Sequence, residues 1–352
     1  RKMAKKILGI DVGSDVLKLA LVKGKQVKKT ASAAMPANMM REGRIVSPEI
    51  LSELIRETMR KNGIHCNRAA VALANEVVFV RNVTVPRMTA DQLTYNLPYE
   101  FRDYITDELK DYVYDYAMFS TKREILEKEE NKASDNAESG SPDEAENGNA
   151  MDLLAVAVPV EIMEEYRGML RKAGLKLIKA APTVCSYMSL IRQVERINRP
   201  SNGEYCILDL GYQAIRMYMF KGDRHQVTRA LEIGLNQIDS VISDAYNVDV
   251  HLAHTYLLSN YDDCQNRDFC INAFNNVVVE LMRALNFYRF SNPDSQLSDI
   301  WLCGGGAAIE SLCTAIQSGL DMLVHPAEEL LPSGRSVNEG YTMIQAVGIT
   351  QE

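Results

Sequence analysis

The chain has 352 residues, of which 46% are hydrophobic and 24% charged, so it is long enough for two domains with hydrophobic cores and is not disordered throughout. The net charge of −8, without a compensating basic cluster, argues against nucleic acid as the main partner. No apolar run approaches the roughly 18 residues that cross a bilayer and no signal peptide opens the chain, so we expect a cytoplasmic protein without direct membrane insertion.

The first predicted element is an apolar strand at 6–10 that ends in Asp11-Val12-Gly13-Ser14, with a second strand at 16–22. A turn of this kind can hold backbone N–H groups against an anion, and its carboxylate can hold a hydrated Mg²⁺. Asp-x-Gly after a strand is also common turn chemistry, so an ordinary hairpin is the alternative.

Residues 35–45 lack clear periodicity and are expected to cross the edge of a sheet as strand and loop. Ser47 is the predicted N-cap of a helix that ends near Asn62. The almost wholly apolar segment 68–74 then predicts a buried central strand.

From 77 to 174 the pattern is strand, helix, strand, strand and helix, which indicates a small α+β module. Its first helix begins at Thr89 and contains Pro98, which removes a backbone donor, so we expect a kink or two short helices. The acidic segment 121–150 is predicted to be a disordered loop, because it cannot bury enough apolar surface to offset its ordering entropy. An acidic tether for a basic partner is the alternative.

A strand at 175–181 and a helix over 182–196 lead to a second copy of the first motif, in which an apolar strand ends in Asp209-Leu210-Gly211 and another strand follows at 214–220. If the two hairpins face each other, they clamp a phosphate chain between their acidic turns. Gly234 precedes a helix whose N–H groups are expected to face the same phosphates.

Further helices are expected at 250–259 and 273–290. An apolar strand then runs into Gly304-Gly305-Gly306, which allows a ligand to approach the backbone closely, and a helix is expected from Ala307. A terminal helix is predicted at 337–348 and should pack on the first half.

The seven cysteines form no CxxC pair and are expected to be reduced residues of the interior. A zinc site is the alternative, although the spacing of its possible ligands fits no standard pattern; those ligands are His251, His254, Cys264 and Cys270.

The order of these motifs is similar to that of the actin, DnaK-type chaperone and sugar kinase superfamily, with its two phosphate motifs and its adenosine motif. Within it the chain resembles the PilM proteins of type IV pilus assembly, relatives of the cell-division protein FtsA. The resemblance covers nearly the whole chain apart from the acidic segment and lies in Asp11-Val12-Gly13-Ser14 with Val16 and Lys18, in 100–105, in 173–175, and in 280–283 leading to 286–288.

The resemblance implies an α/β fold of duplicated actin-like (ribonuclease H-like) domains with a small inserted α+β subdomain. The expected parts are the first actin-like subdomain (IA) at 3–76, the inserted subdomain at 77–174, a return to IA with the crossing helix at 175–197, the second actin-like domain (IIA and IIB) at 198–335, and a C-terminal helix packing back on IA at 336–352.

The resemblance also implies an ATP site. Asp11 and Asp209 would hold Mg²⁺, through water because this ion sheds its hydration shell reluctantly. The nucleotide would be surrounded by Gly13, Ser14, Gly211 and Gly234 at the phosphates, by Gly304, Gly305 and Gly306 as the adenosine floor, and by Glu280 and Arg283 beside the ribose and base. Lys18 would point into the site, with a solvated strand position as the alternative; for Glu280 and Arg283 the alternative is an ordinary ion pair within one helix.

Some positions depart from the superfamily pattern. Tyr212 and Gln213 follow the second acidic turn where small or hydroxyl residues are usual, Gly234-Leu235 stands in place of a double glycine, and the start of the crossing helix carries no acidic residue at 179–183. Hydrolysis needs an oriented water, so we expect nucleotide binding to persist more readily than turnover. An active ATPase and an FtsA-like polymerising protein are the alternatives.

A scaffold function also follows from the resemblance. PilM-like proteins dock the cytoplasmic N-terminal peptide of the membrane protein PilN in a groove between the first actin-like subdomain and the inserted module. This docking would place the chain at the inner face of the cell membrane among pilus motor and platform proteins, with self-association also open. The candidate groove residues are Leu97, Phe101, Tyr104 and Ile105; packing within the module's own core is the alternative for two or three of them. Thr106 stands where the family pattern has proline.

Overall fold

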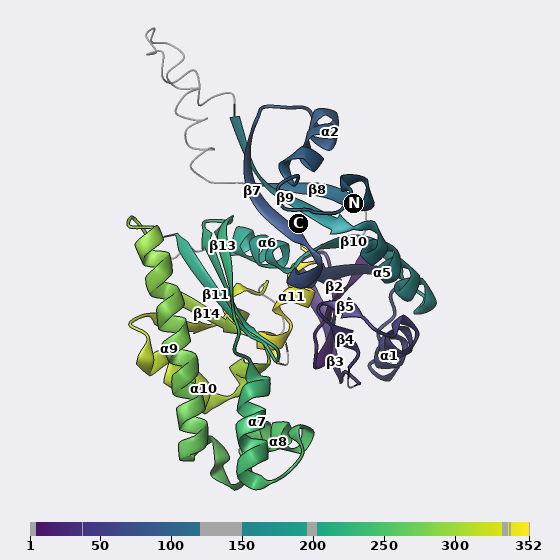
Figure 1. Ribbon diagram of the computed structural model, residues 1–352. Helices are drawn as coiled ribbons and strands as arrows, with labels where there is room; N and C mark the ends of the chain where they lie inside the picture. Colours follow the sequence, from purple (N-terminus) through teal and green to yellow (C-terminus); the bar gives the residue numbers. More distant parts are fainter. Residues whose placement is uncertain are drawn as a thin grey trace.

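The computed structural model describes residues 5–36, 38–119, 150–195, 203–332, 337 and 339–351. Two five-stranded sheets lie side by side with helices packed around them, and a smaller three-stranded sheet adjoins them (Figure 1). The predicted disordered loop at 121–150 falls outside the described residues except for Ala150, which begins a strand.

The first sheet has the order β10-β6-β1-β2-β3. Strands β1, β2 and β3 form an antiparallel meander, while β6 and β10 run parallel to β1. Because both faces of β6 are covered, its sequence is almost wholly apolar. The strands are β1 (Lys6–Val12), β2 (Val16–Lys23), β3 (Gln26–Ala34), β6 (Arg68–Leu73) and β10 (Lys176–Pro182).

The second sheet repeats this arrangement in the order β13-β12-β11-β14-β15. Again a three-stranded antiparallel meander is extended by two parallel strands. The repetition confirms the duplicated α/β fold that the resemblance implies. The strands are β11 (Glu204–Leu210), β12 (Ile215–Lys221), β13 (Arg224–Leu231), β14 (Asp299–Cys303) and β15 (Leu323–Pro326).

Each sheet has its own helices, and we call a sheet with them the first or the second half. In the first half α1 (Pro48–Lys61) and α5 (Val160–Lys172) pack on each other and on the sheet. The helices of the second half are α7 (Leu235–Tyr246), α8 (Val250–Ser259), α9 (Asp268–Ser291) and α10 (Glu310–Gly319). The predicted helix from Ala307 is a 3₁₀ turn, Gly305–Ala308, and α10 begins only at Glu310.

Two helices lie between the sheets, α6 (Thr183–Glu195) and the short α11 (Ile344–Gly348) (Figure 1). Their buried side chains join those of both sheets in one hydrophobic cluster. The terminal helix is predicted at 337–348, but of the described residues there only Ile344–Gly348 are α-helical. The preceding residues instead form a 3₁₀ turn, Gly340–Thr342, in which the Tyr341 carbonyl accepts a hydrogen bond from Gly304 N–H at 3.0 Å.

The three-stranded sheet has the order β7-β9-β8 and is antiparallel throughout. Its elements are β7 (Phe79–Pro86), α2 (Ala90–Glu100), β8 (Tyr112–Met118) and β9 (Ala150–Pro159), which we call the inserted module. α2 continues through Pro98 to Glu100, so the two short helices offered for this segment are wrong, and the kink stays a prediction.

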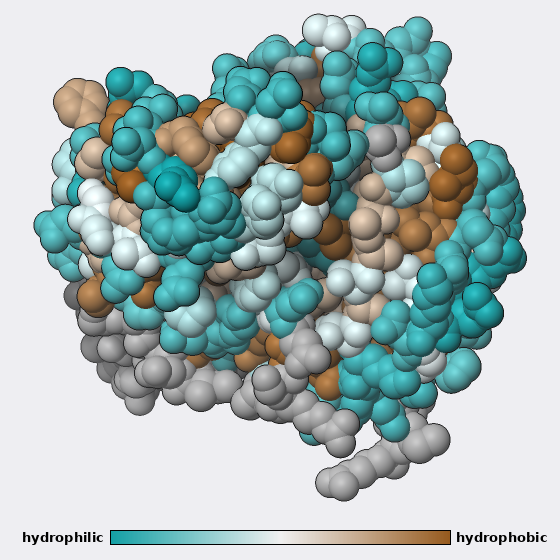
Figure 2. Space-filling model, turned by 90° about the horizontal axis from the view of Figure 1, so that it is seen from below, coloured by the Kyte–Doolittle hydropathy of each residue, from teal (hydrophilic) through white to brown (hydrophobic). Residues whose placement is uncertain are grey.

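The remaining strands are the two-residue pair β4 (Met40–Arg41) and β5 (Arg44–Ile45), which form a small hairpin of their own. Ser47 precedes α1 as predicted, but its side chain makes no capping hydrogen bond. No helix in the described ranges is long and apolar enough to span a membrane. Figure 2 views the molecule from below: hydrophilic residues cover most of this face, and hydrophobic ones gather in separate patches.

Candidate functional site

The two acidic turns meet at one cavity between the halves. It has a volume of about 660 Å³, within the range of small-molecule sites. Parts of the chain far apart in sequence therefore form a single site. The predicted residues that line it are Asp11, Gly13, Ser14, Lys18, Asp209, Gly211, Gly304 and Gly305.

The turns are tight because of their glycines. Gly13 N–H donates to the Val16 carbonyl at 3.1 Å, and a Cβ on Gly13 would lie 2.8 Å from that oxygen. A Cβ on Gly211 would lie 2.5 Å from the Ala214 carbonyl. Any larger residue would open these turns and move the carboxylates that precede them.

Lys18 is not a solvated strand residue. It stands opposite Asp11 in the β1–β2 ladder, and its ammonium group lies 2.9 Å from Asp11 Oδ2, with the two side chains only 13% and 12% exposed. Burial alone would lower the pKa of Lys18, but the carboxylates of Asp11 and Asp209 outweigh it and raise that pKa. The cavity thus has a fixed positive charge near both acidic turns.

Asp209, the carboxylate of the second acidic turn, is partly buried. Burial raises its pKa, while the nearby cations Lys18 and Arg216 oppose that rise. Gln345 Nε2, from α11, donates to Asp209 Oδ2 at 3.0 Å. A site of two carboxylates suits Mg²⁺, which usually keeps several waters and takes one or two carboxylates together with ligand phosphates. Within the described ranges no three His, Cys, Asp or Glu side chains converge as a metal cage.

Gly304 lies against Asp209. Its φ of +85° is in the left-handed region, and a Cβ there would lie 2.4 Å from Asp209 Oδ1. Gly305 lines the cavity beside it, whereas Gly306 packs on Leu210 and does not. The glycine run therefore serves two purposes, two residues at the cavity wall and one in the interior.

Three other predicted residues lie away from the cavity wall. Gly234 packs against the Tyr212 carbonyl, 2.3 Å from the position of a Cβ, and the first N–H groups of α7 donate to the Gly211 and Tyr212 carbonyls instead of facing the cavity. Glu280 and Arg283 form an ion pair on the exposed surface of α9. Their contact with adenosine stays a prediction.

Sequence reasoning missed a second cation in the cavity, Arg216 on β12. It stands opposite Asp209 in the β11–β12 ladder, as Lys18 stands opposite Asp11. The signal was present, since each cation comes seven residues after its aspartate. Arg216 pairs with Glu76 of the first half, and beside this pair Asn75 Nδ2 donates to Tyr218 Oη at 2.5 Å.

His254 on α8 also reaches the cavity. Its Nδ1 lies 2.8 Å from the buried Asp239, and its Nε2 lies 3.5 Å from Asp15 of the first half. Burial opposes the charged ring, but the hydrogen bond that His254 donates to Asp239 outweighs it, together with the charge of that carboxylate, and raises the pKa of His254. Tyr212 packs edge-on against this ring, and burial raises the pKa of Tyr212 to about 12.

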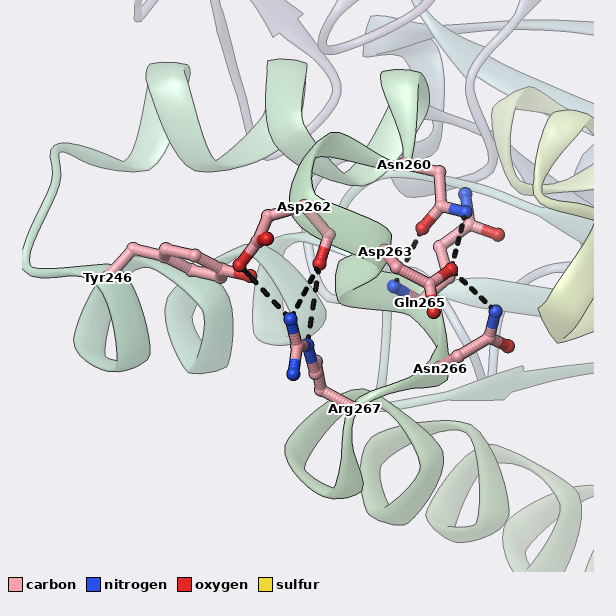
Figure 3. Close-up of polar contacts among 7 residues, drawn as sticks. All are labelled: Tyr246, Asn260, Asp262, Asp263, Gln265, Asn266 and Arg267. Atoms are coloured by element: carbon pink, nitrogen blue, oxygen red, sulfur yellow. Dashed lines mark hydrogen bonds and ion pairs between the residues drawn. The ribbon is translucent and has the colours of Figure 1, made fainter.

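A polar loop at 260–267 follows α8, the helix that carries His254. Asp262 accepts hydrogen bonds from Tyr246 Oη at 3.2 Å and from Arg267 (Figure 3). Asn260 Oδ1 accepts from the Gln265 N–H at 2.9 Å. This network closes the corner between α8 and α9, so α8 presents its side chains to the cavity from a fixed support.

The sequence profile described as "Type IV pilus assembly protein PilM" matches residues 9–133 and 141–338. The chain belongs to the PilM family. No curated protein matches it. Among solved structures it is similar to one titled "PilM-PilN type IV pilus biogenesis complex", with 21% identity, 97% of each chain covered and a TM-score of 0.74. It is also similar to the ethanolamine utilization protein EutJ from Carboxydothermus hydrogenoformans, with 13% identity, coverage of 99% and 92%, and a TM-score of 0.55. Both likenesses support the actin-like fold.

The four candidate groove residues of this PilM family member differ sharply in exposure. Leu97, Phe101 and Ile105 are buried in the core of the inserted module, so the alternative reading holds for these three. Tyr104 is 53% exposed, and the Arg81 guanidinium lies over its ring, 3.8 Å from the centroid. Of the four, only Tyr104 presents a large exposed surface to a partner.

Proposed function

We propose that the cavity binds a nucleotide with Mg²⁺. The observation that carries this proposal is the convergence of Asp11 and Asp209, from two matching turns, on one cavity that also contains Lys18. The carboxylates would hold the metal through water, Gly13, Ser14 and Gly211 would approach the phosphates, and Gly304 and Gly305 would lie beneath the nucleoside. The bound Mg²⁺ would neutralise phosphate charge.

We further propose that the chain acts as a cytoplasmic scaffold of type IV pilus assembly, bound to the inner face of the membrane through a PilN-like protein. Membership of the PilM family supports this function. The partner would dock its N-terminal cytoplasmic peptide beside the inserted module, and Tyr104 is the residue that we assign to the contact because it combines exposure with support from Arg81.

Calorimetric titration of the full chain with ATP and Mg²⁺ tests the nucleotide site. We expect saturable binding that Asp11→Ala weakens by at least about tenfold, because one phosphate or metal contact to a charged group contributes on this scale. Exchange of Asp321, an exposed residue that does not line the cavity, for Ala is a control in which affinity should be unchanged. Absence of binding in the unaltered chain, or equal affinity in the Asp11→Ala variant, would contradict the proposal.

Binding without efficient turnover is the working state that we propose. Tyr212 occupies the cavity wall where the superfamily usually has a small or hydroxyl residue, and a tyrosine is a neutral phenol near pH 7 that supplies no base. Release of inorganic phosphate from ATP measures turnover directly. A steady rate that Asp209→Ala abolishes would show that the chain is an ATPase.

A further inference from the structure

Arg216 is held between two carboxylates of different halves. It stands opposite Asp209 on the neighbouring strand, but its ion pair is with Glu76. Glu76 belongs to the 3₁₀ turn Asn75–Val77, which links β6 of the first half to β7 of the inserted module. The pair therefore crosses the cavity and ties the second half to the entrance of the module.

The equivalent cation of the first half is arranged differently. Lys18 binds its own aspartate, Asp11, so its ion pair stays within one hairpin. Arg216 points across the cavity, and both it and Glu76 line the cavity wall. With side chains 19% and 38% exposed, this pair can exchange partners more readily than the buried Lys18–Asp11 pair.

The chemistry of guanidinium favours such an exchange. Its planar group donates two parallel hydrogen bonds to phosphate oxygens, and it is less strongly hydrated than an ammonium group. Arg216 forms its ion pair with Glu76, whose carboxylate is partly in water, and the charge of Asp209 on the neighbouring strand also acts on it. A phosphoryl group carries more negative charge than one carboxylate and would displace it.

We propose that Arg216 binds the phosphate chain of the nucleotide by exchanging Glu76 for it. This inference rests on the proposed nucleotide site and adds to it a specificity-determining residue. The exchange also removes one of the contacts that tie the turn Asn75–Val77 to the second half and leaves the hydrogen bond from Asn75 to Tyr218, so nucleotide binding loosens the connection that leads into β7.

The test compares ATP with adenosine, both titrated calorimetrically into the full chain. Arg216→Gln should weaken ATP binding by at least about tenfold and leave adenosine binding unchanged, since one charge-assisted contact to phosphate is lost. Arg216→Lys keeps the charge but loses the pair of parallel hydrogen bonds, so its ATP affinity should lie between those of the unaltered chain and Arg216→Gln. Glu76→Gln removes the competitor and should strengthen ATP binding, and in the double variant the Glu76 change should have no further effect.

Arg229→Gln is the matched control, because Arg229 is exposed on β13 over Phe287 and does not line the cavity. If the unaltered chain binds neither ATP nor adenosine, the nucleotide site itself is wrong and this inference falls with it. If ATP binds and Arg216→Gln leaves the ATP-to-adenosine affinity ratio unchanged in a folded variant, only the inference is overturned. Weaker ATP binding by Glu76→Gln would also overturn the exchange.

Discussion

Lys18 and Asp11 stand directly opposite each other on antiparallel strands, and their side chains form a 2.9 Å ion pair at the wall of the cavity. Removal of one partner leaves the other charge buried and uncompensated. Lys18→Met should therefore lower the free energy of unfolding by about 3 kcal/mol. Urea unfolding measures the loss. Lys28→Met, at an exposed position of β3, should change it little, and similar values for the two variants would show that the pair is not stabilising.

Gly304 should tolerate alanine less well than other glycines of similar conformation. Gly304→Ala combines left-handed strain with a clash against Asp209, whereas Gly174, at φ +80°, has open space around the position of a Cβ. Gly174→Ala should destabilise by about 1–2 kcal/mol through backbone strain alone. We expect Gly304→Ala to lose more stability and also nucleotide affinity, as thermal unfolding and calorimetry can determine. Equal losses would mean that the contact with Asp209 does not matter.

His225 should make the fold sensitive to acid. Burial lowers its pKa from 6.5 to about 4, so the folded state holds a neutral ring while the unfolded state takes up a proton below pH 6.5. The resulting stability is present above pH 6.5 and is lost as the pH falls toward 4, by about 3 kcal/mol in all. His225→Gln, which keeps a partner for Thr228 Oγ1, should flatten the dependence of unfolding free energy on pH over this window. The exposed His65→Gln serves as control, and an unchanged slope in His225→Gln would refute the assignment.

Substitutions at Phe101 and Tyr104 should have different effects, the first on folding and the second on partner binding. Phe101 is fully buried in the inserted module, so Phe101→Ala should destabilise by about 3–5 kcal/mol. Tyr104→Ala should leave stability nearly intact and weaken the binding of a peptide from the cytoplasmic N-terminus of a PilN-like protein. Fluorescence anisotropy of the labelled peptide measures this binding. Phe290→Ala, at an exposed aromatic residue on α9, is the control; unaltered affinity in Tyr104→Ala would move the docking surface elsewhere.

The acidic turns could be predicted from sequence because their pattern is local. A buried strand, an aspartate and a glycine lie within a few residues, and the second copy, Asp209 with Gly211, repeats the first. Contacts between the halves carry no such signal. Gln345 reaches Asp209 and Glu76 reaches Arg216 only because two sheets meet, which neither periodicity nor spacing encodes.

Local patterns also misled where burial decides the outcome. An apolar residue near Pro98 could line a surface groove or belong to a core, and the sequence pattern does not distinguish the two. Leu97 and Phe101 belong to the core, because they pack against β7, β8 and β9. Glu280 and Arg283 do pair one turn apart, as their spacing indicates, but the direction in which a helix face points depends on tertiary packing.

Gly9 on β1 has no side chain, which lets the C-terminal helix α11 pack directly against this strand. The carbonyl of Ala346 lies 1.7 Å from where a Cβ of Gly9 would be, so α11 rests directly on the first strand. Ile344, Val347 and Ile349 beside it are wholly buried. During translation the face of β1 that α11 covers therefore stays open until residues 344–349 have left the ribosome, so β1, which emerges before the other described strands, is among the last to find its full set of neighbours.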